Sequence, residues 1–165
     1  MKKLTVLFAA LFMITFAAQN VIASDPQTAT ANAAANIITP MSITKNVDLS
    51  FGNIAAGTAA GTVVLGTNGT RTPNNVILPS VTGTVAASQF TVSGLADATY
   101  VITLPGSITI TSGTNNMTVD NFTENATKTL TAGNETFNVG ATLNVAAGQA
   151  VGLYQGSFNV TVDYQ

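Results

Sequence analysis

Residues 154–165 read YQGSFNVTVDYQ, and this stretch decides the fold class. Its apolar side chains fall on one parity, at Phe158, Val160, Val162 and Tyr164, and polar residues occupy the other. Alternation with a period of two is typical of a β-strand that buries one face. The sequence therefore predicts a strand over residues 153–164, which ends the chain without a further turn.

The same alternation recurs along the chain, and no stretch after the first 23 residues has a convincing period near 3.6. Turn-forming pairs such as Asn68-Gly69 and Ser112-Gly113 separate the runs. The phase slips at Phe122, which predicts a β-bulge. Short strands at this spacing indicate an all-β antiparallel sandwich or barrel. The strands are predicted at 28–39, 43–51, 62–66, 75–86, 89–94, 99–104, 107–111, 116–122, 135–145 and 153–164.

The segment TATANAAANII, residues 28–38, supports two interpretations. Alanine is the best helix former, so an alanine-rich run can be helical. Thr and Asn interrupt this run, however, and Pro40 follows closely. The period-two pattern favours a strand whose small side chains would fit a groove between other strands. That strand would place on one face Ala29, Ala31, Ala33, Ala35 and Ile37.

The first residues have the layout of a secretory signal peptide. Lys2 and Lys3 precede an apolar run from Leu4 to Phe16, and Ala23 supplies a small residue at the expected cleavage site. The run is short for a membrane span, which needs ~20 residues, although an uncleaved anchor is the alternative. We expect a signal peptide over residues 1–23 and a single domain over 24–165, exported to the bacterial periplasm, outer surface or medium. No segment after residue 23 is long and apolar enough to be predicted as a transmembrane helix.

The composition argues against catalysis and against nucleic-acid binding. The chain has no Cys and no His, so neither a Ser-His-Asp triad nor a typical zinc site can be built. After residue 23, three basic side chains remain against seven acidic ones, which gives a net charge of −4. Nucleic acid would require a basic patch. We therefore expect a protein that is not an enzyme, carries no cofactor and binds no nucleic acid.

Asp120 and Glu124 are the weak candidates for a metal site. They lie in TVDNFTEN beside asparagines, and oxygen ligands at short spacing could hold calcium. Two carboxylates are a thin ligand set, and a solvated strand end is the simpler interpretation. A pair of carboxylates also suits glycoside hydrolysis, but few aromatic residues are present to form sugar platforms. The alternative function is therefore a secreted calcium- or carbohydrate-binding module.

Three stretches resemble a bacterial family of domains of unknown function, number 4402: TPMSITKNVDLSFGNIAAG (residues 39–57), GTRT (69–72) and FNVGATLNVAAGQAVGLYQGSFNVTVDY (137–164). This likeness covers nearly the whole chain after the leader, and the family has no assigned activity. The two ends of the chain are also similar to spore coat protein U domains and archaic chaperone–usher pilins. The motif LSFG at residues 49–52 carries this similarity at one end, and the predicted strand from Gly152 to Tyr164 carries it at the other. The pilin group usually has a disulfide near its first strand, whereas this chain has no Cys.

The pilin resemblance implies an immunoglobulin-like antiparallel β-sandwich that lacks its final strand. Phe158, Val160, Val162 and Tyr164 would then line a groove that accepts a strand from another subunit. Residues 24–36 would be the candidate donor or N-terminal strand, and a periplasmic chaperone would cover the groove before assembly. The sequence also allows a second arrangement. In it the sandwich is complete, and the N-terminal segment pairs with the last strand of its own chain. The function expected is a structural or adhesive, pilin-like subunit of a fimbrium at the cell surface.

Overall fold

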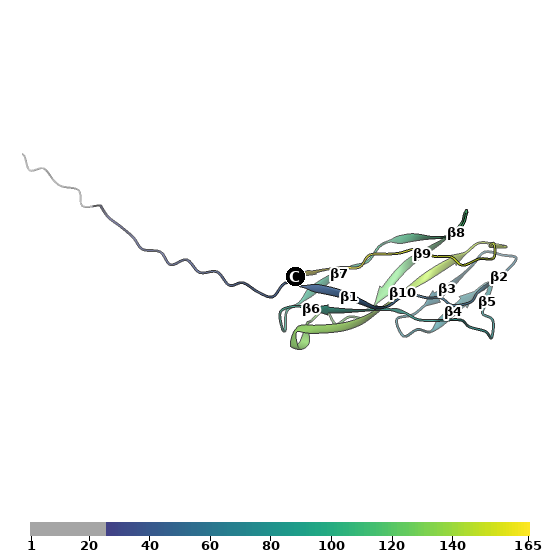
Figure 1. Ribbon diagram of the computed structural model, residues 1–165, viewed down its shortest axis with the longest axis horizontal. Coiled ribbons are helices and arrows are strands. Elements are labelled where there is room, and N and C mark those ends of the chain that lie inside the picture. Colours follow the sequence, from purple (N-terminus) through teal and green to yellow (C-terminus); the bar gives the residue numbers. More distant parts are fainter. Residues whose placement is uncertain (1–25) are drawn as a thin grey trace, which may run out of the picture. The chain divides into compact units, whose positions relative to one another are not determined.

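The computed structural model describes residues 26–165, which divide into two units, one reaching Asn36 and one spanning Ile37–Gln165 (Figure 1). The predicted signal peptide and cleavage site lie outside the described residues. The fold is all-β and antiparallel, apart from one 3₁₀ turn at Thr131–Gly133. No helix in residues 26–165 is long and apolar enough to cross a membrane. The strands are β1 Ser42–Val47, β2 Ala55–Ala56, β3 Gly61–Leu65, β4 Arg71–Asn74, β5 Val76–Ile77, β6 Ser88–Ser93, β7 Tyr100–Thr103, β8 Ser107–Ser112, β9 Asn115–Glu124, β10 Asn134–Val145 and β11 Thr161–Tyr164.

Strand β10 organises the largest sheet, which has seven strands. The first half of β10 pairs with β6 and its second half pairs with β3. β9 also pairs with β10, from Val139 to Asn144. β1 and β4 extend the sheet beyond β6 and β3, and β8 extends it beyond β9. The longest alternating run of the sequence therefore forms the strand that holds both halves of the sheet together.

The predicted irregularity near Phe122 is confirmed. The register of β9 against β10 shifts between Gly140 and Thr142, and Asn121 has a φ of 47° in the same stretch of β9. The predicted turn at Ser112-Gly113 is also present, because β8 and β9 form a hairpin there and Gly113 has a φ of 58°. Glycine reaches this positive φ without the steric cost of a Cβ atom.

The inner side chains of the sheet form two apolar clusters. The first contains Phe90 and Phe137, whose stacked rings lie 5.8 Å apart, together with the fully buried Tyr100. The second is centred on Val63, Val119 and Leu143, which are almost completely buried. Phe122 packs against both clusters. The sheet therefore curls around a continuous apolar interior, as in a β-sandwich, and we confirm the predicted all-β antiparallel class.

The last strand, β11, pairs with β7 in a separate two-stranded sheet, with Val162 opposite Ile102. Val162 and Tyr164 pack against the first cluster. β2 and β5 form a third, very short sheet. The end of the chain, marked C in Figure 1, lies close to the beginning of β1.

Several predicted boundaries are wrong. Residues 28–39 form no strand, because they belong to no ladder of the described residues and a strand without a ladder leaves its backbone groups unpaired. The predicted strand over 153–164 is regular only from Thr161, and that over 75–86 is reduced to β5. β4, which lies outside every predicted strand, includes Pro73; proline is tolerated there because β4 is an edge strand of its sheet.

Candidate partner-strand groove

A groove of about 1300 Å³ lies between β1 and the C-terminal segment 148–160. Ile43 and Lys45 of β1 form part of one wall, which continues through residues 48–56. Residues 148–160 form the opposite wall. The lining residues that also belong to the core clusters or pack against them are Ile43, Leu49, Phe51, Ile54, Ala56, Phe90, Ile108, Ile110, Met117, Val119, Leu143, Val145, Phe158 and Val160. The groove is therefore an opening into the interior of the sandwich.

The mouth of the groove exposes large apolar side chains. Val151 is 100% exposed and Leu153 is 75% exposed, and both belong to the lining. One ion pair of the described residues, between Lys45 and Asp48, lies on the opposite wall. Exposed side chains of this kind at an apolar opening are typical of an interaction surface.

Both walls also present backbone groups that no neighbouring strand uses within residues 26–165. β1 pairs with β6 on one side only. Residues 156–160 belong to no ladder or bridge, although Gln155 is bridged to Thr111 of β8. Gly156 lies close to β8, because a Cβ at this position would meet the Thr109 carbonyl oxygen and the Ile110 side chain, each at 2.8 Å. Among the described residues, β1 therefore pairs on one side only, and residues 156–160 pair on neither side, so both walls have backbone groups that a further strand could use.

Hydrogen bonds close the groove at both ends. At one end the Tyr164 hydroxyl donates to the Thr39 carbonyl over 2.8 Å and accepts from the Leu95 amide over 2.6 Å. At the other end the Gly148 amide donates to the Gly57 carbonyl over 3.0 Å. The chain segments that form the two walls are thus hydrogen-bonded to each other beyond the groove, through Tyr164 and Thr39 on one side and through Gly148 and Gly57 on the other.

The four residues predicted to line a partner-strand groove divide into two pairs. Phe158 and Val160 line the groove. The Phe158 ring lies 5.0 Å from that of Phe122 and 6.2 Å from that of Phe90. Val162 and Tyr164 belong to β11 and pack against the first cluster beyond the groove.

The candidate donor residues lie in a segment without regular structure. Every residue from 26 to 40 is exposed, and none of them belongs to a strand. This includes all of Ala29, Ala31, Ala33, Ala35 and Ile37, the last of which is 95% exposed. The segment therefore has accessible backbone groups and one large accessible apolar side chain.

Tyr100, a buried member of the first cluster, forms a polar pair with the half-buried Glu135. The hydroxyl of Tyr100 donates to Glu135 over 2.7 Å, and Glu135 also accepts hydrogen bonds from the amides of Thr127 and Lys128. Burial and the neighbouring carboxylate raise the pKa of Tyr100 well above its ordinary value. Burial acts to raise the pKa of Glu135, but the three hydrogen bonds outweigh it and hold this pKa below 4.5. The pair fixes the loop before β10 and adds nothing to the groove lining.

Asp120 and Glu124 contact different partners. Asp120 accepts a hydrogen bond from Asn121 over 3.0 Å, and Glu124 pairs with Lys128 over 3.0 Å. The residues that the structure describes contain no group of three or more Asp, Glu, His or Cys able to hold a metal ion. The calcium hypothesis therefore stays a prediction that rests on these two side chains alone.

The sequence interpretation missed half of the groove wall. Leu49, Phe51 and Ile54 lie outside regular strands and pack against the second cluster. The sequence shows apolar and polar residues alternating at Leu49, Ser50 and Phe51. Only the fold shows that this stretch lies opposite residues 148–160. Leu153 was predicted as the first residue of a strand and Val151 lay outside every predicted strand, so the exposure of these two side chains at the groove could not be deduced from the sequence.

Comparison with known proteins identifies the family. The family model described as "Domain of unknown function (DUF4402)" matches residues 41–164. The chain belongs to this family. The match begins immediately before β1 and ends at the last residue of β11, so it spans both walls of the groove. No curated protein and no solved structure matches this chain.

Proposed function

We propose that this DUF4402 protein is a non-enzymatic structural subunit, pilin-like, that assembles by strand complementation at the bacterial cell surface. The observation that carries the proposal is the groove between β1 and residues 148–160, which combines an apolar interior with an unpaired backbone edge on each wall. A strand added there would pair with both edges and insert alternate side chains into the interior. The immunoglobulin-like topology of the pilin group is part of this proposal.

The occupant is the N-terminal segment of a second copy or of a related subunit. Residues 26–38 are exposed and alternate in small apolar side chains, and they are about as long as the wall formed by residues 148–160. Their alanines would add little buried area each, at ~0.8 kcal/mol per buried CH₂ group, so backbone pairing would supply much of the binding. Ile37 would supply the largest apolar contact.

The hydrogen bonding at Thr39 favours donation to another copy over insertion of the segment into its own groove. A turn through Pro40 would direct the segment back along β1 and would use the Thr39 carbonyl for its closing hydrogen bond. Residues 39–41 form no turn before β1 begins at Ser42, and the Thr39 carbonyl accepts the Tyr164 hydroxyl. Donation from copy to copy in one direction does not close on itself and produces a filament.

The partners follow from this arrangement. A bare groove with apolar side chains at its mouth would aggregate, so a periplasmic chaperone would cover it before assembly. Neither an enzyme activity nor a cofactor is part of the proposal. The leader sequence supports export, and the resemblance of the chain ends to pilins supports the fimbrial assembly and the adhesive role.

The test compares the exported protein with a variant that lacks residues 27–36. Light scattering after gel filtration and electron microscopy measure the size of the particles. We expect the parent chain to form polymers and the shortened chain to remain monomeric. A matched control keeps the length and replaces Ala29, Ala31 and Ala33 by Asp, which should also stop assembly. Polymers of equal length from all three proteins, or a parent that is monomeric at every concentration, would reject strand donation.

A further inference from the structure

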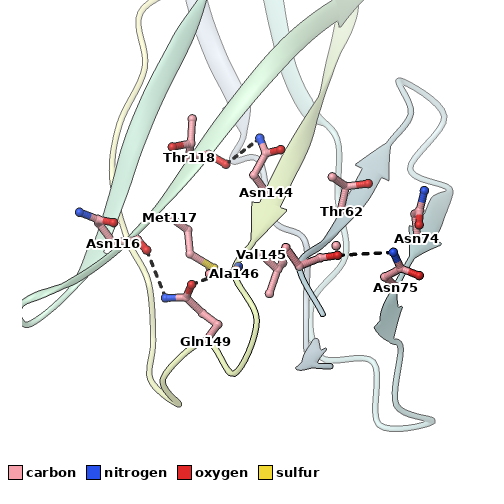
Figure 2. A pocket seen from close by; sticks show the side chains of 12 residues that line it. Thr62, Asn74, Asn75, Asn116, Met117, Thr118, Asn144, Val145, Ala146 and Gln149 are labelled. Carbon is pink, nitrogen blue, oxygen red and sulfur yellow. Dashed lines mark hydrogen bonds between the residues drawn. The ribbon is translucent and has the colours of Figure 1, made fainter. Parts of the chain in front are cut away.

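A second hollow, of about 470 Å³, lies where β10 ends, and amide side chains dominate its lining (Figure 2). Asn74 and Asn75 come from β4 and the residue after it, Asn116 from β9, Asn144 from β10 and Gln149 from the turn that follows. The volume falls within the ~300–1,000 Å³ typical of small-molecule sites. Met117, Val145 and Gln149 also line the partner-strand groove, so the two hollows adjoin.

Strand register assembles one side of this hollow. Asn144 of β10 lies opposite Thr118 of β9 and opposite Thr62 of β3, and Thr62 lies opposite Asn74 of β4. Residues that face each other across neighbouring strands share a face of the sheet. Four strands thus present one uncharged row of hydroxyl and amide groups.

Backbone contacts hold three of the amides in place. Gln149 donates to the Asn116 carbonyl over 3.1 Å and to the Tyr154 hydroxyl over 2.8 Å. Asn144 donates to the Thr118 carbonyl over 3.3 Å, and Asn75 donates to the Ala60 carbonyl over 3.4 Å. Figure 2 shows the contacts of Gln149 with Asn116 and of Asn144 with Thr118 around the hollow. Asn75 and Asn144 are each held through one hydrogen, so they keep the second hydrogen and the oxygen lone pairs for another molecule, whereas Gln149 uses both hydrogens and also accepts from the Ala146 amide.

Two further amides retain their full capacity. Within residues 26–165 the side chains of Asn74 and Asn116 take part in none of the protein's hydrogen bonds, although both line the hollow. Asn74 is exposed and lies at the outer edge of the polar row. The lining therefore combines fixed amides with free ones, around the half-buried side chain of Met117.

The chemistry of this lining selects a neutral polyhydroxylated molecule. None of the described residues that line the hollow is charged, so an ion would lose hydration without a compensating partner. Hydroxyl groups both donate and accept, as amides do, and the C–H face of a sugar can contact Met117 and Val145. We infer that the hollow binds a neutral saccharide. The site is separate from Asp120 and Glu124, neither of which lines it.

The inference stands independently of strand complementation, because a monomer carries the complete site. Assembly would multiply it, since one weak site in each copy of a filament would bind a polysaccharide multivalently. Each binding event after the first would then be effectively intramolecular.

The test is a titration of the ¹⁵N-labelled protein with a panel of neutral oligosaccharides of glucose, xylose, mannose, galactose and N-acetylglucosamine. Oligogalacturonate serves as the charged comparison. We expect at least one neutral oligosaccharide to shift the side-chain amide signals of Asn74, Asn116 and Asn144. Replacement of Asn144 by Ala should weaken its binding at least tenfold, and the exposed change Asn74→Ala about threefold.

Asn46→Ala is the matched control. Asn46 is an exposed asparagine of β1 that contacts Thr91 and does not line the hollow, so its replacement should leave the affinity unchanged. The inference is overturned if no neutral oligosaccharide shifts these signals, or if oligogalacturonate binds more tightly. Binding that survives both Asn144→Ala and Asn74→Ala would also overturn it. Unchanged strand amide shifts in each variant establish that the fold is intact.

Discussion

The last eighteen residues contain two regions with similar composition and different surroundings. Residues 161–164 form β11, pair with β7 and bury Val162 and Tyr164 against the first cluster. Residues 148–160 have one bridge to β8, and they leave Val151 and Leu153 exposed beside an open groove. Alternation specifies which face of a segment is apolar, whereas pairing depends on a neighbour on each side. The open region is therefore the one that lacks a neighbour.

The largest expected effect comes from supplying that neighbour. A copy of residues 26–38 fused after Gln165 through a flexible linker should enter the groove of its own chain. We expect stabilisation of about 4 kcal/mol, as for a ligand at a thousand times its Kd, or roughly 10 °C in thermal unfolding. The fusion should also end polymerisation, because it occupies the acceptor.

The control fusion carries Asp in place of Ala31 and Ala33 in the added copy. A charge directed into the apolar groove lacks a compensating partner, so this fusion should unfold at the same temperature as the parent protein. Equal melting temperatures for the two fusions would mean that the added segment does not bind in the groove.

Two truncations sharpen the contrast within the open region. Phe158 packs edge-on against Phe90 and also contacts Phe122, so Phe158→Ala should destabilise the monomer by about 3 kcal/mol. Leu153 is mostly exposed, and Leu153→Ala should change monomer stability by less than ~0.5 kcal/mol while it weakens assembly. Urea unfolding of the monomer measures the first effect, and the critical concentration for assembly measures the second. Similar losses of stability for both variants would contradict the placement of Phe158 in the interior and of Leu153 at the exposed mouth of the groove.

Acid should weaken the part of the sandwich beside β7. The pKa of Glu135 is lower in the folded chain than in the unfolded one, so the ionised carboxylate stabilises the fold at pH values above about 4.5. This contribution is lost as the pH falls through the folded pKa. Glu135→Gln should cost about 2 kcal/mol at pH 7 and should flatten the pH dependence between pH 5 and 3, as measured by urea unfolding. If the free energy of unfolding of the variant falls with pH as steeply as that of the parent, the acid sensitivity belongs to other carboxylates.

The most local effect concerns the hydrogen bonds of Tyr164 beyond the end of the groove. Tyr164→Phe removes one hydrogen bond to Thr39 and one to Leu95, at about 1 kcal/mol each. Hydrogen exchange at the Leu95 amide should accelerate several-fold while exchange in β10 stays unchanged. If Leu95 exchanges at the parent rate, the Tyr164 hydroxyl does not hold this end of the groove.

The sequence predicts most strands because alternation and turns are local properties. The runs that became β6, β7, β8, β9 and β10 were placed within a few residues, and the irregularity near Phe122 was expected. The groove was expected from resemblance alone. Its first wall, around Leu49 and Phe51, depends on contacts between distant segments, and no local pattern contains that information. The amide hollow was missed because its five amides come together only through strand register and the turn after β10.

The most direct test of the account is a cross-link between copies. A photoreactive phenylalanine derivative replaces Ala33 in a ¹⁵N-labelled chain, which is assembled with unlabelled chains, and mass spectrometry locates the products. We predict cross-links from labelled residue 33 to unlabelled peptides that contain residues 43–56 or 150–160, the two walls of the groove. Cross-links confined to the same chain, or to peptides outside the groove, would contradict strand donation between copies.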